Sequence, residues 1–138
     1  MSQYDVRLHR TVLVVESEPV IAMDLAAELV DHGVDVAGPF SNSADALVWL
    51  ESSKPDCAII DAGLRDGSGF EIARQLRRGN VPFMFFSDAE AFEPEAITTW
   101  SDAPWLGKPI SSSHVVRILE GLPCSGLSRD PTGREPPA

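Results

Sequence analysis

The chain has 138 residues, a length typical of one domain, and its 43% hydrophobic content suits a packed core rather than a disordered chain. Its formal net charge of −10, from 21 acidic and 11 basic residues, argues against a nucleic-acid partner, which would need clustered Lys and Arg. No apolar stretch approaches the ~20 residues of a membrane span, and the N-terminus lacks a signal-peptide pattern. Cys57 and Cys124 are too few for a disulfide framework or a zinc signature, so we expect a cytoplasmic protein.

Strand-like and helix-like segments alternate along the chain. Residues 1–10 look like a lead-in, and Thr11–Val15 is a β-rich run. Pro19 then opens a helix, and Gly33 is its natural end. The apolar face of this helix is expected to comprise Ala22, Leu25, Ala26, Leu29 and Val30.

A short second strand is predicted over residues 34–37, closed by Gly38-Pro39. Residues 41–43 supply cap candidates for the next helix, which ends before Pro55. The inward side chains of this helix are expected to be Leu47, Val48 and Leu50.

Cys57–Ile60 is a fully apolar third strand, followed by a helix that starts at residue 68 or 69. Residues 82–86 form a fourth strand. Such apolar strands, separated by helices, predict an α/β fold whose parallel sheet is covered on both faces.

The last part of the chain is less regular. Residues 87–94 are polar and acidic, so we expect a short or frayed fourth helix near residues 95–100. A weak fifth strand over 103–107 and a last helix over 111–122 complete the domain, which spans residues 11–122. Residues 123–138 contain four prolines and two glycines and are predicted to be a disordered tail.

Polar side chains follow four of the five predicted strands. Glu16 follows the first strand, Asp61 the third, Ser87 the fourth and Lys108 the fifth. Because the carboxyl ends of parallel strands meet at one edge of a sheet, these four side chains are expected to gather there.

Four motifs together resemble the receiver domain of two-component response regulators, over about residues 10–122. They are VVESEP at residues 14–19, the PD, IID and DGSG groups within residues 55–69, the strand that ends in Ser87, and Lys108-Pro109. The resemblance implies a doubly wound, flavodoxin-like, five-stranded sheet of order 2-1-3-4-5. The run VPFMFFS at residues 81–87 also looks like the stand-alone receivers of α-proteobacteria.

The resemblance also implies roles for individual residues. Asp61 matches the phosphoacceptor, whose carboxylate attacks a phosphohistidine and becomes an acyl phosphate. Lys108 matches the lysine that neutralises the phosphoryl oxygens, and Ser87 the hydroxyl that hydrogen-bonds one of them and moves when the group arrives. Mg²⁺ would be bound by Glu16, Asp61 and the backbone carbonyl of Gly63.

The sequence departs from the family pattern at one position. Ser17 stands where the second acid of the metal-binding pair is usual, so we expect weak Mg²⁺ binding. Glu18 follows, shifted by one residue. Trp105 occupies the place of the switch aromatic, three residues before the lysine, and Lys108-Pro109 is a candidate cis peptide.

Other interpretations of the same residues are simpler. Asp61 could cap a loop, Glu16 could be a solvated strand end, Ser87 a turn residue, Lys108 a surface lysine and Trp105 plain core packing. The joint register of Glu16, Asp61, Ser87 and Lys108 at strand ends favours the site, whereas Trp105 fits both interpretations equally.

Two related classes of protein are disfavoured. Gly63 stands where a haloacid-dehalogenase-like phosphatase needs a second aspartate, and Glu16 and Glu18 would repel the phosphate of a flavin. Asp66-Gly67 is predicted to be a simple turn with Asp66 solvated. No metal-ligand spacing joins the three histidines, His9, His32 and His114.

These observations predict a single-domain response regulator that is not an enzyme and that signals by protein–protein contact. A histidine kinase or histidine phosphotransferase would be the phosphodonor, and a downstream protein the target, without nucleic acid or membrane. No output domain is expected, because residues 123–138 are too few and too polar to fold as one. The alternative is a non-catalytic binding adaptor with a receiver fold, which Ser17 favours. The oligomeric state is left open.

Overall fold

The structure is a computed structural model that describes residues 10–67 and 69–122. The predicted tail over residues 123–138, and the lead-in apart from Arg10, lie outside the described residues. Five parallel strands form one sheet of order β2-β1-β3-β4-β5, which confirms the predicted fold. The strands are β1 (Thr11–Val15), β2 (Asp35–Phe40), β3 (Cys57–Ile60), β4 (Phe83–Ser87) and β5 (Trp105–Gly107).

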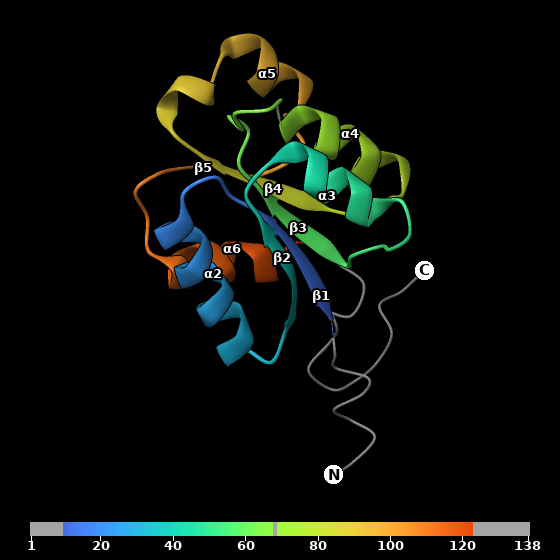
Figure 1. Ribbon diagram of the computed structural model, residues 1–138. Coiled ribbons are helices and arrows are strands. Elements are labelled where there is room, and N and C mark those ends of the chain that lie inside the picture. The colour runs from blue at the N-terminus through green and yellow to red at the C-terminus, as the bar shows by residue number, and fades with distance from the viewer. Residues whose placement is uncertain (1–9, 68, 123–138) are drawn as a thin grey trace, which may run out of the picture.

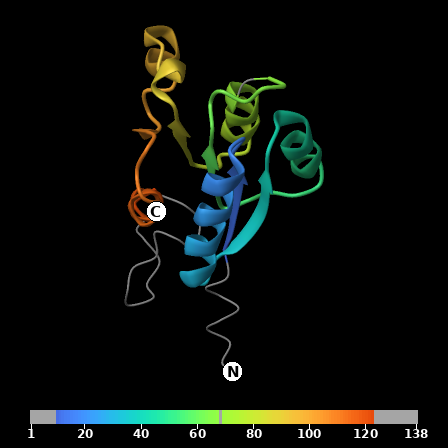
Figure 2. The ribbon, with the colours of Figure 1, turned by 60° about the vertical axis from the view of Figure 1, so that its left-hand side comes forward.

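Helices cover both faces of this sheet (Figures 1 and 2). They are α2 (Pro19–Asp31), α3 (Ser43–Leu50), α4 (Gly69–Arg78), α5 (Pro94–Thr99) and α6 (Ser112–Glu120), with a 3-10 turn η1 (Ala89–Ala91) before α5. α2 and α6 pack on one face through a core that includes Leu25, Leu29 and Leu119. α3 and α4 pack on the other face through Ala46 and Ile72. Successive strand residues therefore point into two separate cores.

The fourth helical segment is short and irregular, as predicted. η1 and α5 together contain one 3-10 turn and six helical residues, and none of the side chains of α5 is buried.

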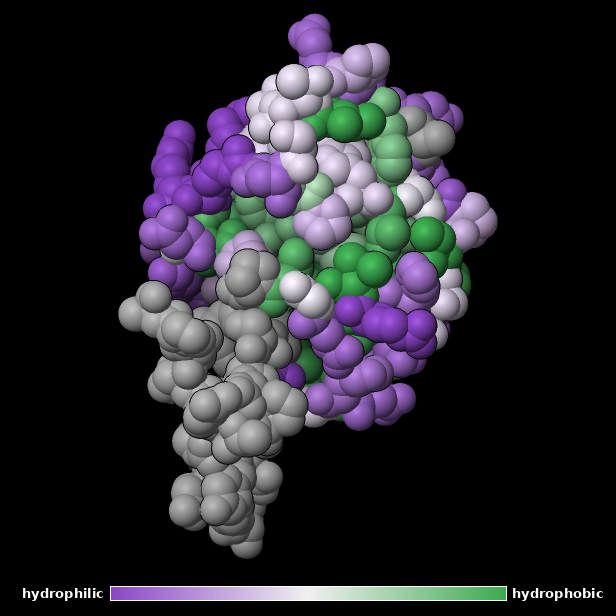
Figure 3. Space-filling model, turned by 180° about the vertical axis from the view of Figure 1, so that it is seen from behind, coloured by the Kyte–Doolittle hydropathy of each residue, from purple (hydrophilic) through white to green (hydrophobic). Residues whose placement is uncertain are grey.

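On the face turned away from the viewer of Figure 1, apolar surface lies in the middle and hydrophilic side chains surround it (Figure 3).

Three sequence-based boundaries or faces are wrong. β2 runs through Gly38-Pro39 to Phe40, which is possible because β2 is an edge strand and a proline there breaks no ladder on its open side. Val30 and Val48, predicted to face inward, are 60% and 61% exposed. The buried residues of α2 are spaced three and four apart, as in Ala22, Leu25 and Leu29, and Val30 lies a further 100° round the helix.

Asp66 does not only form the predicted turn but also binds the start of α3. It is exposed, but its carboxylate accepts hydrogen bonds from the backbone N–H groups of Ser43 (2.8 Å) and Ala44 (3.0 Å). These bonds hold its pKa below the usual range. Asn42 caps the same helix end by accepting from the N–H of Asp45 at 2.8 Å. The loop after β3 is thereby fastened to the start of α3.

Gly69 joins α4 to the end of β3 by close backbone contact. A Cβ added at Gly69 would lie 2.4 Å from the carbonyl oxygen of Asp61 and 2.7 Å from Cγ2 of Ile60. No side chain fits in that space, so the helix can approach the Asp61 backbone only through a glycine.

We expect Gly69→Ala to destabilise the domain by about 1–3 kcal/mol, the usual cost of overpacking a buried contact. Gly67→Ala is the matched control, because the atoms nearest an added Cβ there are at 3.7 Å or more. Urea unfolding of both variants measures the difference. Equal stability of the two variants would contradict the close contact at Gly69.

Candidate functional site

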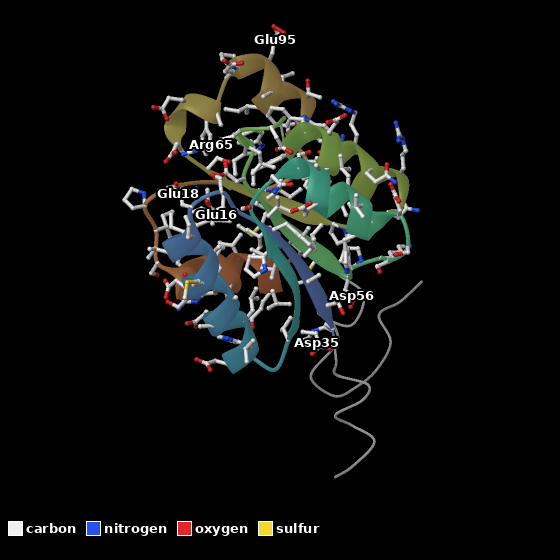
Figure 4. All side chains as sticks on the ribbon, in the orientation of Figure 1. Glu16, Glu18, Asp35, Asp56, Arg65 and Glu95 are labelled. Carbon is white, nitrogen blue, oxygen red and sulfur yellow. The ribbon has the colours of Figure 1, made fainter. Side chains whose placement is uncertain are left out.

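Four predicted site residues meet at the carboxyl edge of the sheet. The backbone places them through three hydrogen bonds that extend the strand ladders, from Glu16 N to Phe40 O (2.8 Å), Asp61 N to Val15 O (2.9 Å) and Lys108 N to Ser87 O (3.0 Å). Figure 4 shows Glu16 and Glu18 at this edge, while Asp35 and Asp56 lie at the opposite end of the sheet.

The carboxylate of Asp61 is buried and receives four hydrogen bonds. Its Oδ1 accepts from the N–H of Gly63 (3.0 Å) and from the hydroxyl of Ser87 (3.2 Å). Its Oδ2 accepts from the hydroxyl of Ser17 (3.1 Å) and from Nζ of Lys108 (3.2 Å). Both oxygens are thus held in place, and a carboxylate so supplied with donors is stabilised in its ionised form.

Lys108 is surrounded by acids. Its Nζ lies 2.7 Å from Oε2 of Glu16, 2.9 Å from Oε2 of Glu18 and 3.2 Å from Oδ2 of Asp61, and its side chain is only 3% exposed. Burial alone would lower the pKa of Lys108, but the hydrogen bonds to Glu16 and Glu18 and the charge of Asp61 outweigh burial and raise it.

The pKa values of the two buried carboxylates are pushed apart. Burial raises the pKa of Glu16 to about 7, although Lys108 and the N–H of Glu18 favour its ionised form and the charge of Asp61 opposes it. Burial opposes ionisation of Asp61 too, but the N–H of Gly63 and the charge of Lys108 outweigh it and hold the pKa of Asp61 below its usual range. Asp61 is therefore the group that stays charged when one of the pair is protonated.

Glu18 is the site residue that sequence reasoning did not assign. Its shift of one residue left its direction open, yet its carboxylate contacts Lys108 at 2.9 Å while remaining half-exposed. The backbone turns back at this point, because the N–H of Glu18 donates to Oε2 of Glu16 at 3.0 Å. The sequence signal that could have revealed this is Pro19, which starts α2 and fixes the residue before it in an extended conformation.

Glu16, Asp61 and Ser17 offer two carboxylates and one hydroxyl to a metal ion, with Gly63 exposed beside them. Oxygen donors of this kind suit Mg²⁺. Within residues 10–67 and 69–122, however, no group of three or more His, Cys, Asp or Glu could hold a metal. The donor set fits Mg²⁺ with one charged ligand fewer than an acidic pair would supply.

Trp105 packs in an aromatic cluster instead of contacting the acids. Its ring lies 4.4 Å from that of Phe85 and 5.0 Å from that of Phe92, and its Nε1 donates to the carbonyl of Trp100 at 3.2 Å. The next residues reach the site, and the Lys108–Pro109 peptide bond is cis, the isomer that the resemblance implies.

The raised pKa of Glu16 makes a prediction about stability. A carboxyl whose folded-state pKa exceeds its unfolded value contributes stability that is present below the unfolded pKa of 4.5 and is lost as pH rises through about 7. We therefore expect the free energy of unfolding of the native protein to fall relative to that of Glu16→Gln between these pH values, by up to about 3 kcal/mol.

Denaturant unfolding at a series of pH values measures this difference. Glu71→Gln, which removes an exposed carboxylate on α4, serves as the control for the loss of one acidic side chain. A constant difference between the native protein and Glu16→Gln would show that Glu16 is ionised throughout.

No helix among the described residues is long and apolar enough to span a membrane.

The chain is similar in sequence to known proteins. The family model for the response regulator receiver domain matches residues 12–120. The chain is 32% identical over 120 residues to the transcriptional regulatory protein PdtaR of Mycobacterium tuberculosis, which covers 84% of this chain and 58% of PdtaR. It is 32% identical over 118 residues to the sensory transduction protein LytT of Bacillus cereus, covering 79% of this chain and 45% of LytT. The chain thus spans about half the length of these relatives.

Solved structures show the same fold. The receiver domain of a putative LuxO repressor from Vibrio parahaemolyticus superposes with a TM-score of 0.72 at 20% identity, covering 87% of this chain and 91% of that one. The chemotaxis response regulator CheY4 of Vibrio cholerae gives 0.69 at 22% identity, covering 81% and 97%. Receiver domains are phosphoacceptors of two-component systems, interact with histidine kinases and generally bind Mg²⁺ in an acidic pocket. With the family model matched over most of its length, the chain belongs to the response regulator receiver domain family.

Proposed function

We propose that the chain accepts a phosphoryl group on Asp61 from a histidine kinase or a histidine phosphotransferase and signals by contact with another protein. The observation that carries this proposal is the buried Asp61 carboxylate, which is held by four donors and lies 3.2 Å from Lys108. The role is that of a phosphoacceptor rather than of an enzyme that turns over a substrate. The proposed donors act in the cytoplasm, so the proposal places this protein there.

The transfer itself needs a nucleophile and neutralisation of charge. An Asp61 oxygen forms a bond to the phosphorus while the bond from phosphorus to the imidazole nitrogen of the donor breaks, and the electron pair stays on that nitrogen. Lys108 and the hydroxyl of Ser87 both hydrogen-bond Asp61, so each is within reach of an oxygen of the incoming group. Ser87 would give up its bond to Asp61 in doing so and becomes the first residue to move.

Glu16, Asp61 and the carbonyl of Gly63 are the residues proposed to hold Mg²⁺, which when bound neutralises the charge of the phosphoryl oxygens. The ammonium of Lys108 already contacts both carboxylates, so it must give up part of these contacts when a second cation arrives. Glu18 offers the ammonium another partner at 2.9 Å. Ser17 contributes a hydroxyl where a carboxylate would bind more strongly, and the proposed affinity is therefore weak.

The outer face of α2 is the proposed docking surface for the phosphodonor. Val20 (79% exposed), Met23 (70%) and Val30 (60%) lie along this face, and α2 starts three residues after Glu16. An exposed apolar stripe on a helix suits packing against a partner helix. Its continuity with the site would bring a histidine on that helix towards Asp61.

The proposed output surface begins at Ser87 and Lys108. Ser87 is followed by η1 and α5, and Lys108 by α6. α5 has no buried side chain, so its position depends on few contacts and can shift at low energetic cost. A phosphoryl group bound by Ser87 and Lys108 would therefore bias the placement of these segments for a downstream protein.

A second candidate function is that of a binding adaptor that works without phosphorylation. Ser17 favours it, because the hydroxyl weakens the metal site on which fast phosphorylation depends. Phosphorylation of the native protein at a rate typical of receivers would exclude it.

We expect Asp61→Asn to abolish phosphorylation by acetyl phosphate in Mg²⁺, because an amide oxygen is too weak a nucleophile. Intact-mass spectrometry detects the added phosphoryl group. Asp66→Asn is the control, since Asp66 is an exposed carboxylate five residues away that binds α3 and not the site, and it should be labelled like the native protein. A labelled Asp61→Asn protein would place the phosphoacceptor elsewhere.

We expect Ser17→Asp to tighten Mg²⁺ binding by more than ~1 kcal/mol, because it adds a charged ligand to a site that has two. Calorimetric titration with Mg²⁺ measures the change. Ser17→Asn is a matched control of similar size without the charge and should not tighten binding. Equal affinities of the native protein and Ser17→Asp would mean that Glu18 already supplies the missing ligand.

A further inference from the structure

A basic groove lies between α4 and the end of α5. It has a volume of about 390 Å³ and is lined by Arg74, Arg77, Arg78, Thr99 and Trp100. The three arginines are exposed on α4. Such a concentration of positive charge is unusual in a chain with 21 acidic and 11 basic residues.

Two of these arginines lack a counter-ion within the described part of the chain. Arg77 is used internally, because its guanidinium lies 4.4 Å from the centre of the Trp100 ring and pairs with Asp102. Arg78 makes only a long hydrogen bond of 3.4 Å to Gln75, and Arg74 makes no ion pair with a described residue. Arg77 thus fixes the groove wall, while Arg74 and Arg78 present free positive charge.

The complementary surface is in the same molecule. Residues 88–95 carry four exposed carboxylates, and no Lys or Arg occurs between Arg78 and Lys108. The four carboxylates are those of Asp88, Glu90, Glu93 and Glu95. None of them forms an ion pair with a described residue. Figure 4 shows Glu95 directed away from the body of the molecule.

The two charged surfaces are neighbours on one side of the fold. The groove wall includes Thr99, the last residue of α5, and Trp100 directly after it, and Glu95 lies in the first turn of the same helix. α4 and α5 lie at the same end of the molecule in Figures 1 and 2. When a two-fold axis passes between two neighbouring patches of opposite charge, the basic patch of each copy faces the acidic patch of the other copy.

From this geometry we infer that α4 and the η1–α5 segment form a self-complementary surface that pairs two copies of this chain. Arg74 and Arg78 of each copy contact the carboxylates of residues 88–95 of the other copy, so the same set of contacts forms twice. Ile97, 38% exposed on α5, lies between Glu95 and the groove residue Thr99 along the chain and supplies an apolar contact near the axis. The inference does not rest on the phosphoacceptor role of Asp61.

Charge sets the strength of this pairing. The formal net charge of −10 on each copy opposes approach, but at 0.1 M salt charges more than about 10 Å apart are largely screened, whereas the facing pairs are in contact. Exposed ion pairs are individually weak, so the pairing is expected to be reversible and to depend on protein concentration.

Sedimentation velocity of the full chain over a range of concentrations, without Mg²⁺ or phosphodonor, tests the inference. The native protein should show concentration-dependent pairing. Arg74→Glu/Arg78→Glu and Glu90→Lys/Glu93→Lys should each weaken pairing by about tenfold or more, because each puts like charges against each other. An equimolar mixture of the two variants should pair again, since the reversed groove of one variant then faces the lysine-bearing segment of the other, while the native groove faces the native carboxylates.

Arg65→Glu/Arg117→Glu is the control for Arg74→Glu/Arg78→Glu, because it makes the same change of net charge at exposed arginines outside the groove, and it should pair like the native protein. Circular dichroism confirms that each variant is folded. A monomeric native protein, or a mixture that does not pair, would overturn the inference. Binding of poly-glutamate by a native protein that stays monomeric, lost in Arg74→Glu/Arg78→Glu, would assign the groove to another acidic protein and equally overturn it.

Discussion

The structure depends on one buried ammonium group shared by three carboxylates. Lys108 contacts Glu16, Glu18 and Asp61 within 3.2 Å while almost fully buried. Breaking such a pair by removing one partner leaves an uncompensated buried charge, which costs several kcal/mol. The strands β1, β3 and β5 are thus tied at their carboxyl ends by charge as well as by the ladder. When all four groups are ionised, the network is two positive charges short of neutrality, and the charge of Asp61 adds to the burial that raises the pKa of Glu16.

Much of the fold could be predicted because its signals are local and repeated. Fully apolar strands such as Cys57–Ile60 alternate with segments of helical periodicity, and this alternation indicates a parallel sheet with both faces covered. Parallel strands then place Glu16, Asp61, Ser87 and Lys108 at one edge, whatever the details of the loops. The contacts among these residues agree with that expectation, while their roles in phosphoryl transfer are proposals.

The errors arose where the outcome depends on a neighbouring element. The exposure of Val30 is set by how α2 rolls on the sheet, which periodicity alone defines only to within one residue. β2 continues past Gly38-Pro39 because it is an edge strand, and strand order is a property of the whole sheet. The bond of Asp66 to α3 joins residues 22 and 23 positions apart, so no local pattern could show it.

Ser17 and Glu18 together change where negative charge is placed without removing it from the site. An acidic pair would direct both charges at a metal ion, whereas here Glu16 and Glu18 both contact Lys108, and Ser17 donates a hydrogen bond to Asp61. A hydroxyl that donates to Asp61 stabilises the ionised form of that carboxylate, which a carboxylate at residue 17 would oppose by repulsion. Glu18 also gives the ammonium a half-exposed partner besides the buried Glu16 and Asp61. If the proposed function holds, Ser17 would exchange metal affinity for an Asp61 carboxylate and a Lys108 ammonium that are organised without the metal, and the balance between these effects would set how strongly the site depends on Mg²⁺.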